Sequence, residues 1–160
     1  MNSLYDSRQL LKYLFIVAAV VIAIASVFVS DLLIKDLARE ERQKIEVWAE
    51  ATRVLTSEDP SLNMNLILQI IQGNTAIPVM LCNDRDSVMN YKNLELPEKN
   101  VDEFLQKKVQ ELKKKKDPIV IDMEDGTYQY LYYDDSLILK RLLVYPYAQL
   151  TVMAVFILTA

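Results

Sequence analysis

Histidine is absent from this chain of 160 residues, which contains only two glycines and one cysteine. Without histidine, the chain lacks the commonest general base and the commonest metal-binding side chain. Gly73 and Gly126 are too few to build a phosphate-binding loop. A single cysteine, Cys82, excludes an internal disulfide framework and a multi-cysteine metal site, and we expect a buried, inert thiol. We therefore predict no catalytic residues, no metal site and no cofactor within these residues.

Charge is scarce in one part of the chain and concentrated in another. The run YLFIVAAVVIAIASVFVS at 13–30 carries no charge, whereas 31–141 holds nearly every charged residue. At 1.5 Å per residue this run spans about 27 Å as a helix, close to the thickness of a bilayer core. We expect a transmembrane helix over 13–30 after a short tail over 1–12, and charge alone leaves its orientation open. A cleaved signal peptide is the alternative, because basic residues precede the run and small ones lie within it. The net charge of −4 does not favour nucleic-acid binding.

The last residues are again apolar and uncharged, with AQLTVMAVFILTA at 148–160. Counted from Ala148, a helix would rise only about 20 Å, which is too short to cross a bilayer. We therefore expect a chain that stops within a second membrane helix at 148–160, with Tyr145 and Tyr147 as interfacial aromatics. A buried terminal strand or helix is the alternative.

The residues after the first apolar run are rich in helix formers and predict one long helix over about 31–56. Its apolar positions recur at steps of three and four, and Glu41 interrupts them. This stripe packs on its own domain, and in the alternative reading part of it also packs on the same helix of a second copy. The candidates for a dimer interface are Ile34, Leu37, Ile45 and Trp48.

Between 57 and 147 the pattern alternates between helical and extended segments. A short helix, capped by Asp59 or Ser61 and ended by Gly73, precedes a hairpin formed by 76–82 and 88–94. A third helix begins at Asn100 or Val101 and ends near Lys116. A second hairpin joins 118–123 to 128–134 through Asp125-Gly126, and 136–145 reads as a strand or a helix. We predict a strand there, which completes a five-stranded antiparallel sheet in an α+β domain.

Three groups of side chains are candidates for binding. The run Lys113–Lys116 is expected to be a solvated helix end, with anionic ligands or lipid headgroups as the alternative. An ordinary acidic turn is favoured over a divalent-cation site for Asp122, Glu124, Asp125, Asp134 and Asp135. The tyrosines of 128–133 are expected to pack on a helix, and the alternative is that Tyr130 and Tyr132 line a ligand cavity. The candidate ligand-binding residues are Tyr130, Tyr132, Cys82 and Tyr91.

An apolar span, a long helix and then PVMLCNDRDSVMNYKNL together resemble the extracytoplasmic sensor region of bacterial two-component histidine kinases. In that family a PAS-like or Cache-like module lies between two transmembrane helices. The resemblance implies a PAS/Cache-like sensor domain over 31–147 on the periplasmic side of the bacterial inner membrane, with the N-terminus in the cytoplasm.

The resemblance also implies partners. They are a second copy in a homodimer, a small-molecule ligand, and a cognate response regulator contacted by a cytoplasmic kinase region outside this sequence. That region would bear the phosphorylated histidine and bind ATP and Mg²⁺. The chain would then detect an extracytoplasmic signal and relay it across the membrane. Two alternatives are the sensor of a chemoreceptor or cyclase, and a membrane-anchored structural or assembly protein.

Overall fold

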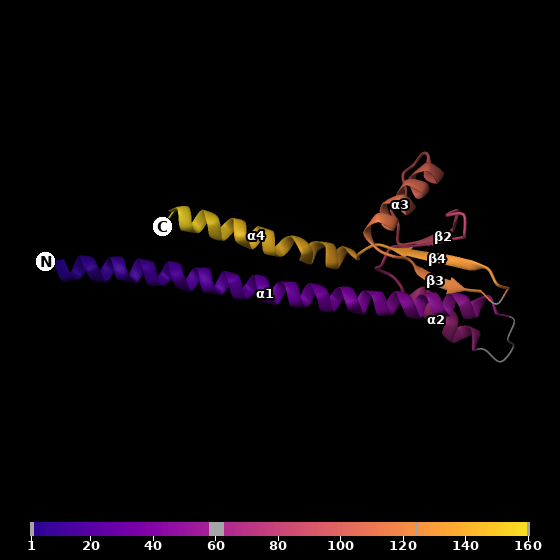
Figure 1. Ribbon diagram of the computed structural model, residues 1–160, viewed down its shortest axis with the longest axis horizontal. Coiled ribbons are helices and arrows are strands. Elements are labelled where there is room, and N and C mark those ends of the chain that lie inside the picture. The colour runs from indigo at the N-terminus through magenta and orange to yellow at the C-terminus, as the bar shows by residue number, and fades with distance from the viewer. Residues whose placement is uncertain (1, 58–62, 124, 160) are drawn as a thin grey trace. The chain divides into compact units, whose positions relative to one another are not determined.

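The computed structural model describes residues 2–57, 63–123 and 125–159 (Figure 1). The chain forms two compact units. A helical unit comprises 1–37 and 138–160, and an α+β unit comprises 38–137. Helix α1 (Asn2–Leu55) is continuous along the chain from the first unit into the second. The predicted continuation of the apolar run into a long helix is thus confirmed for the described residues.

The helical unit consists of the first part of α1 and nearly all of helix α4 (Leu137–Thr159). Both helices are long and apolar enough to cross a membrane, judged by length and composition. The most apolar window of α1 is 6% buried within the chain, and that of α4 is 0% buried. The most apolar parts of both helices are therefore exposed in this structure.

The strand predicted over 136–145 is wrong, because α4 begins at Leu137. The apolar residues there fit either period in a short window, but the less exposed positions recur at steps of three and four, which is the helical spacing. They are Leu139, Leu142, Pro146, Gln149 and Met153. The helix that contains the apolar run after Ala148 is longer than that run, since the 23 residues of α4 span about 35 Å. The bounds of a second membrane segment at 148–160 stay a prediction.

The sheet of the α+β unit has four strands among the described residues, one fewer than predicted. They are β1 (Val79–Cys82), β2 (Val88–Lys92), β3 (Ile119–Asp122) and β4 (Tyr128–Tyr133), in the order β2-β1-β4-β3. All neighbouring strands are antiparallel, so both predicted hairpins are confirmed. The lost fifth strand is the segment that forms the start of α4.

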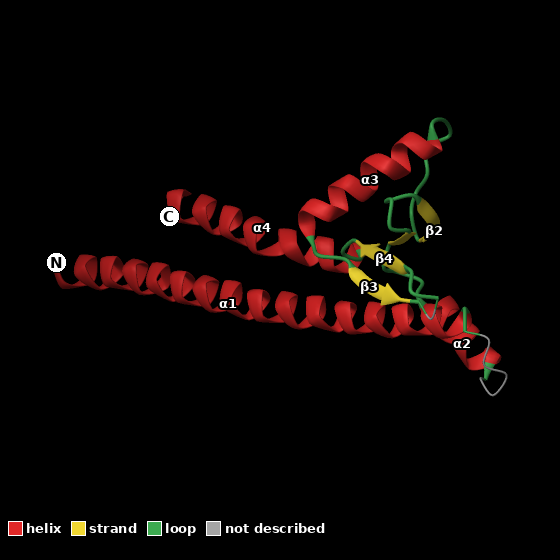
Figure 2. Ribbon diagram, turned by 45° about the vertical axis from the view of Figure 1, so that its right-hand side comes forward, coloured by secondary structure: helices red, strands yellow, loops and turns green. Residues whose placement is uncertain are grey.

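Helices cover both faces of this sheet (Figure 2). On one face, Val79 and Leu81 belong to a core that includes Ile45 and Trp48 of α1. On the other face, Met80 and Cys82 pack with residues of helix α3 (Val101–Lys115). Because side chains alternate along a strand, β1 supplies both cores and is buried at all four positions.

Helix α2 (Met64–Gly73) packs on the first core through Ile71, and Ile67 is its buried residue. Its N-cap is Asn63, whose side-chain oxygen accepts from the N–H of Leu66 at 3.3 Å. The caps predicted at Asp59 or Ser61 lie outside the described residues. The C-terminal carbonyl of Ile71 accepts from the Trp48 indole at 3.1 Å, which fixes α2 to α1.

Candidate functional site before helix α4

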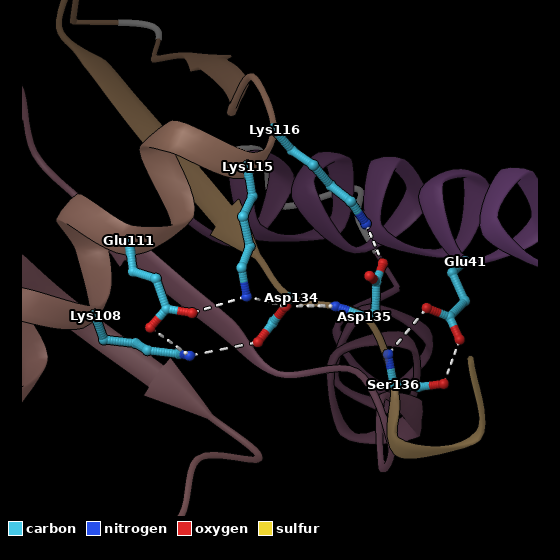
Figure 3. Close-up of polar contacts among 8 residues, drawn as sticks. All are labelled: Glu41, Lys108, Glu111, Lys115, Lys116, Asp134, Asp135 and Ser136. Atoms are coloured by element: carbon cyan, nitrogen blue, oxygen red, sulfur yellow. Dashed lines mark hydrogen bonds and ion pairs between the residues drawn. The ribbon is translucent and has the colours of Figure 1, made fainter. Parts of the chain in front are cut away.

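Three consecutive polar residues, Asp134, Asp135 and Ser136, connect strand β4 to helix α4, and we call them the junction. Asp134 and Ser136 are each only 3% exposed, which is rare for polar side chains without partners. The backbone N–H of Asp134 donates to the carbonyl of Pro78 at 3.0 Å, so the segment starts from a fixed position beside β1. Figure 3 shows that all three side chains contact residues of α1 or of the C-terminal part of α3 and its cap.

Asp134 is held by two lysines of α3. Its two carboxylate oxygens lie 3.4 Å from the Nζ atom of Lys108 and 3.5 Å from that of Lys115. Glu111 contacts the same lysines, at 3.0 Å and 2.7 Å. The two acids and two bases therefore alternate, which provides the buried Asp134 carboxylate with the opposite charge that it requires. Hydrogen bonds from Lys115 and then Lys108 lower the pKa of Glu111, and Glu111 raises the pKa of Lys115.

Asp135 is paired with Lys116, the residue that caps α3. The backbone N–H of Lys116 donates to Leu112 at 3.1 Å and closes the last turn of the helix. Its ammonium also lies 4.7 Å from the ring centroid of Tyr133, in the range of a cation–π contact. The end of α3 is thus attached to two consecutive residues of the junction and to the end of β4.

Ser136 is bound by helix α1. One oxygen of the Glu41 carboxylate accepts from the backbone N–H of Ser136 at 3.1 Å, and the other accepts from its hydroxyl. Ser136 directly precedes α4, where the N–H groups of a helix start lack partners within the helix. A carboxylate at this position satisfies such a donor and interacts favourably with the helix dipole. Glu41 is itself only 5% exposed.

Arg42 adds a second contact from α1 to the same region. Its Nη1 donates to the hydroxyl of Tyr133 at 3.5 Å, and its Nε donates to Glu46 at 2.9 Å. The hydrogen bond with Tyr133, and to a smaller extent that with Glu46, raises the pKa of Arg42, which therefore stays cationic. Two adjacent residues of α1 contact the segment that leads from β4 into α4.

The four predicted ligand-binding residues lie together on the α3-facing side of the sheet. Tyr91 and Tyr132 are the register partners of Met80 on either side of β1, and Tyr130 is the partner of Cys82. The buried members, Tyr132 and Cys82, pack with side chains of α3, whereas Tyr91 is 40% exposed. The structure brings these residues together, and their binding of a ligand stays a prediction.

A polar group borders this face at the turn between β1 and β2. The Asp86 carboxylate is ion-paired with Lys113 and accepts from the hydroxyl of Tyr132 at 3.3 Å. Asp86 has a φ of 58°, in the left-handed region. Burial, with a smaller contribution from Asp86, raises the pKa of Tyr132. Burial also raises the pKa of the Cys82 thiol to about 11, so the predicted buried, protonated thiol fits its surroundings.

The lysines at the end of α3 contact different parts of the domain. Lys113 pairs with Asp86, while Lys115 and Lys116 pair with the two aspartates of the junction. The expected solvated helix end is thus, at these three positions, a set of contacts within the domain.

The acidic residues around the second hairpin have separate roles. Asp125 accepts from the N–H and hydroxyl of Thr127 at 2.9 and 2.6 Å, which lowers the pKa of Asp125. Glu124 lies outside the described residues. Within the part of the chain that the structure describes, no three His, Cys, Asp or Glu side chains are placed to hold a metal ion.

The predicted dimer-interface residues fall into both units. Ile45 and Trp48 are buried in the first core of their own α+β unit. Ile34 and Leu37 belong to the helical unit, where they are half-buried. Ile45 and Trp48 thus pack on their own domain, and contact with a second copy stays a prediction at all four positions.

From the sequence, Asp134 and Asp135 were considered only as part of an acidic turn or a divalent-cation site, and Ser136 was not singled out. Two signals could have indicated the junction. Glu41 is a charge within an otherwise apolar helical stripe, and such a charge needs a buried partner. Asp134, Asp135 and Ser136 precede an apolar run and are residue types that favour helix starts. Neither signal identifies its partner, which lies far away in the sequence.

No protein-family model, curated protein or solved structure matches this chain. Its architecture is two long apolar helices flanking a small α+β domain with a four-stranded antiparallel sheet.

Proposed function

We propose that this chain is the membrane-anchored sensor portion of a bacterial two-component histidine kinase, with the α+β domain on the periplasmic side. The observation that carries the proposal is the junction, where α1 and α3 both bind the three residues that lead into α4. Both α1 and α4 have the length and composition of membrane spans. A change within the domain would thus act directly on residues continuous with a membrane helix.

The relay in this proposal is a two-state equilibrium at the junction. A stimulus that shifts α3 or the sheet changes the distances from Lys108, Lys115 and Lys116 to the two aspartates. Ser136 follows them in the chain, so its bond with Glu41 is strengthened or weakened. Shifts of about 1–2 Å between packed helices are typical of such switches. The stimulus needs only to favour one of the two arrangements.

The direct trial joins the whole chain, after Ala160, to a cytoplasmic kinase module whose autophosphorylation is measured in vesicles. Glu41→Gln and Ser136→Ala weaken the contact at the start of α4. A change of about 1 kcal/mol in the balance of two states shifts their ratio roughly fivefold, and kinase output should follow. Glu40→Gln is the matched control, since Glu40 forms only an exposed pair with Lys44.

If both junction variants give the output of the unmodified chain, the relay is refuted. The rival function as an assembly protein, whose outer domain binds protein and senses nothing, predicts that outcome. An altered output in Glu40→Gln of the same size would also contradict the relay, because the effect would then not depend on the junction.

Orientation is tested separately with single cysteines in a Cys82→Ala background. Glu95 is exposed in the α+β domain, and Lys12 precedes the first apolar run. In intact cells, a membrane-impermeant thiol reagent should label Glu95→Cys, and should label Lys12→Cys only after the membrane is permeabilised. Labelling of both positions from outside, or release of the protein by carbonate, contradicts the proposed topology.

A further inference from the structure

A polar contact connects the two apolar helices of the helical unit. The hydroxyl of Ser26 on α1 donates to the side-chain oxygen Oε1 of Gln149 on α4 at 2.9 Å. Ser26 lies five residues before Asp31, about 7.5 Å along the helix from the nearest charge of the α+β side. Gln149 lies within 142–159, which contains no charged residue. Both polar groups therefore lie within the segments assigned to the membrane.

The contact uses only part of the hydrogen-bonding capacity of Gln149. An amide side chain has two N–H donors and an oxygen that accepts two bonds. Ser26 occupies one acceptor position, and within the described residues Nε2 has no acceptor. Hydrocarbon offers no acceptor either, so these donors are costly to leave in a lipid environment. The amide thus has two free donors and one free acceptor position.

We infer that Gln149 pairs with the same glutamine of a second copy of this chain. Each Nε2 donates to the partner's Oε1 and uses the acceptor position that Ser26 leaves free. The pair is self-complementary, which is the property that a two-fold dimer interface requires. A second copy is favoured over another membrane protein because it brings a group with the matching donors and acceptor to the same depth. The inference rests on the membrane insertion contained in the proposed function.

The test measures dimerisation of the full chain in lipid vesicles by energy transfer between donor- and acceptor-labelled chains. The label is attached at Glu95→Cys in a Cys82→Ala background. Gln149→Leu should raise the dissociation constant by about 3- to 20-fold for each hydrogen bond lost. Gln149→Asn keeps the amide on a shorter side chain and should give a smaller rise.

The matched control is Thr151→Val, on the same helix. The Thr151 hydroxyl donates to the carbonyl of Tyr147 at 2.9 Å within its own helix, so its removal should leave the dissociation constant unchanged. A second measurement places single cysteines over 145–156 and oxidises the vesicles. Cross-links between chains should recur with helical periodicity and be strongest on the side of Gln149.

Several outcomes overturn the inference. They are a monomer at all concentrations, equal dissociation constants for Gln149→Leu and the parent, or cross-links centred on the opposite side of α4. Carbonate extraction separates this failure from failure of the proposed function. A protein that stays in the membrane but shows any of these results loses only the glutamine pair, whereas a protein released by carbonate loses both.

Discussion

The carboxylate of Glu41 binds both the backbone N–H and the hydroxyl of Ser136, which lies 95 residues further along the chain. This pair explains why a charge occurs within the apolar stripe of α1, since the carboxylate satisfies donors that precede α4. The same contact connects α1 to the residue that directly precedes α4. Its strength can be measured, because the only tryptophan, Trp48, is buried in that domain and reports its unfolding.

We expect Glu41→Ala to lower the free energy of unfolding by about 2–3 kcal/mol. The variant leaves the buried N–H and hydroxyl of Ser136 without their acceptor, and hydrogen bonds to charged groups are the stronger ones. The measurement is urea denaturation of the full chain in mild detergent, followed by Trp48 fluorescence. Glu40→Ala, which removes only an exposed ion pair, should stay within about 0.5 kcal/mol of the parent.

The pair between Lys108 and Asp134 should show a coupling free energy of about 1–2 kcal/mol in a double-mutant cycle with Lys108→Met and Asp134→Asn. The aspartate is 3% exposed and the lysine 19%, so water and salt screen the pair weakly. A cycle on Glu50 and Arg53, which are more exposed, should give only about 0.3–0.5 kcal/mol. Equal coupling in both cycles would show that burial does not strengthen the junction pair.

Replacements of Asp86 should separate backbone strain from side-chain contacts. Asp86→Ala loses the bonds to Lys113 and Tyr132 and keeps a Cβ in the left-handed conformation. Asp86→Gly loses the same bonds but tolerates a positive φ, so it should be about 1 kcal/mol more stable than Asp86→Ala. Thermal unfolding followed by Trp48 fluorescence provides the comparison, and a less stable glycine variant would contradict it.

The Cys82 thiol should resist alkylation by iodoacetamide in the native protein at pH 8 and react once urea unfolds the domain. Burial raises its pKa from about 9 to about 11, and only the thiolate is nucleophilic. Because the native state holds the Cys82 proton more tightly than the unfolded state, raising the pH through this range destabilises the native state. The stability that the protonated thiol contributes is fully present below about pH 9 and is lost as the pH rises toward 11. Native labelling at pH 8 as fast as that of the unfolded chain would refute the buried state.

Protein extracted from membranes should retain residues 1–30. We expect this because the uncharged run is longer than the apolar region of a usual signal peptide and continues beyond its small residues. Intact mass spectrometry decides the matter directly. A mass that corresponds to cleavage after Ala25 would remove the first membrane span and with it the relay.

Local patterns were sufficient to predict much of this fold. Three signals depend only on neighbouring residues and could be recognised without knowing the tertiary contacts. They are the apolar run at 13–30, the helix-forming composition that follows it, and the turn at Asp125-Gly126. The segment 136–145 was not, because its apolar residues suit a strand or a helix. The helix there is joined at its start to Glu41, a contact that no local pattern contains.

The sequence by itself determined where apolar helices, hairpins and charge lie, because these depend on the period and composition of neighbouring residues. Only the tertiary structure decided that Asp134, Asp135 and Ser136 meet α3 and α1, and that the predicted tyrosines share one face of the sheet. The physical reason is that a buried charge needs a partner, and folding can supply that partner from any distance along the chain.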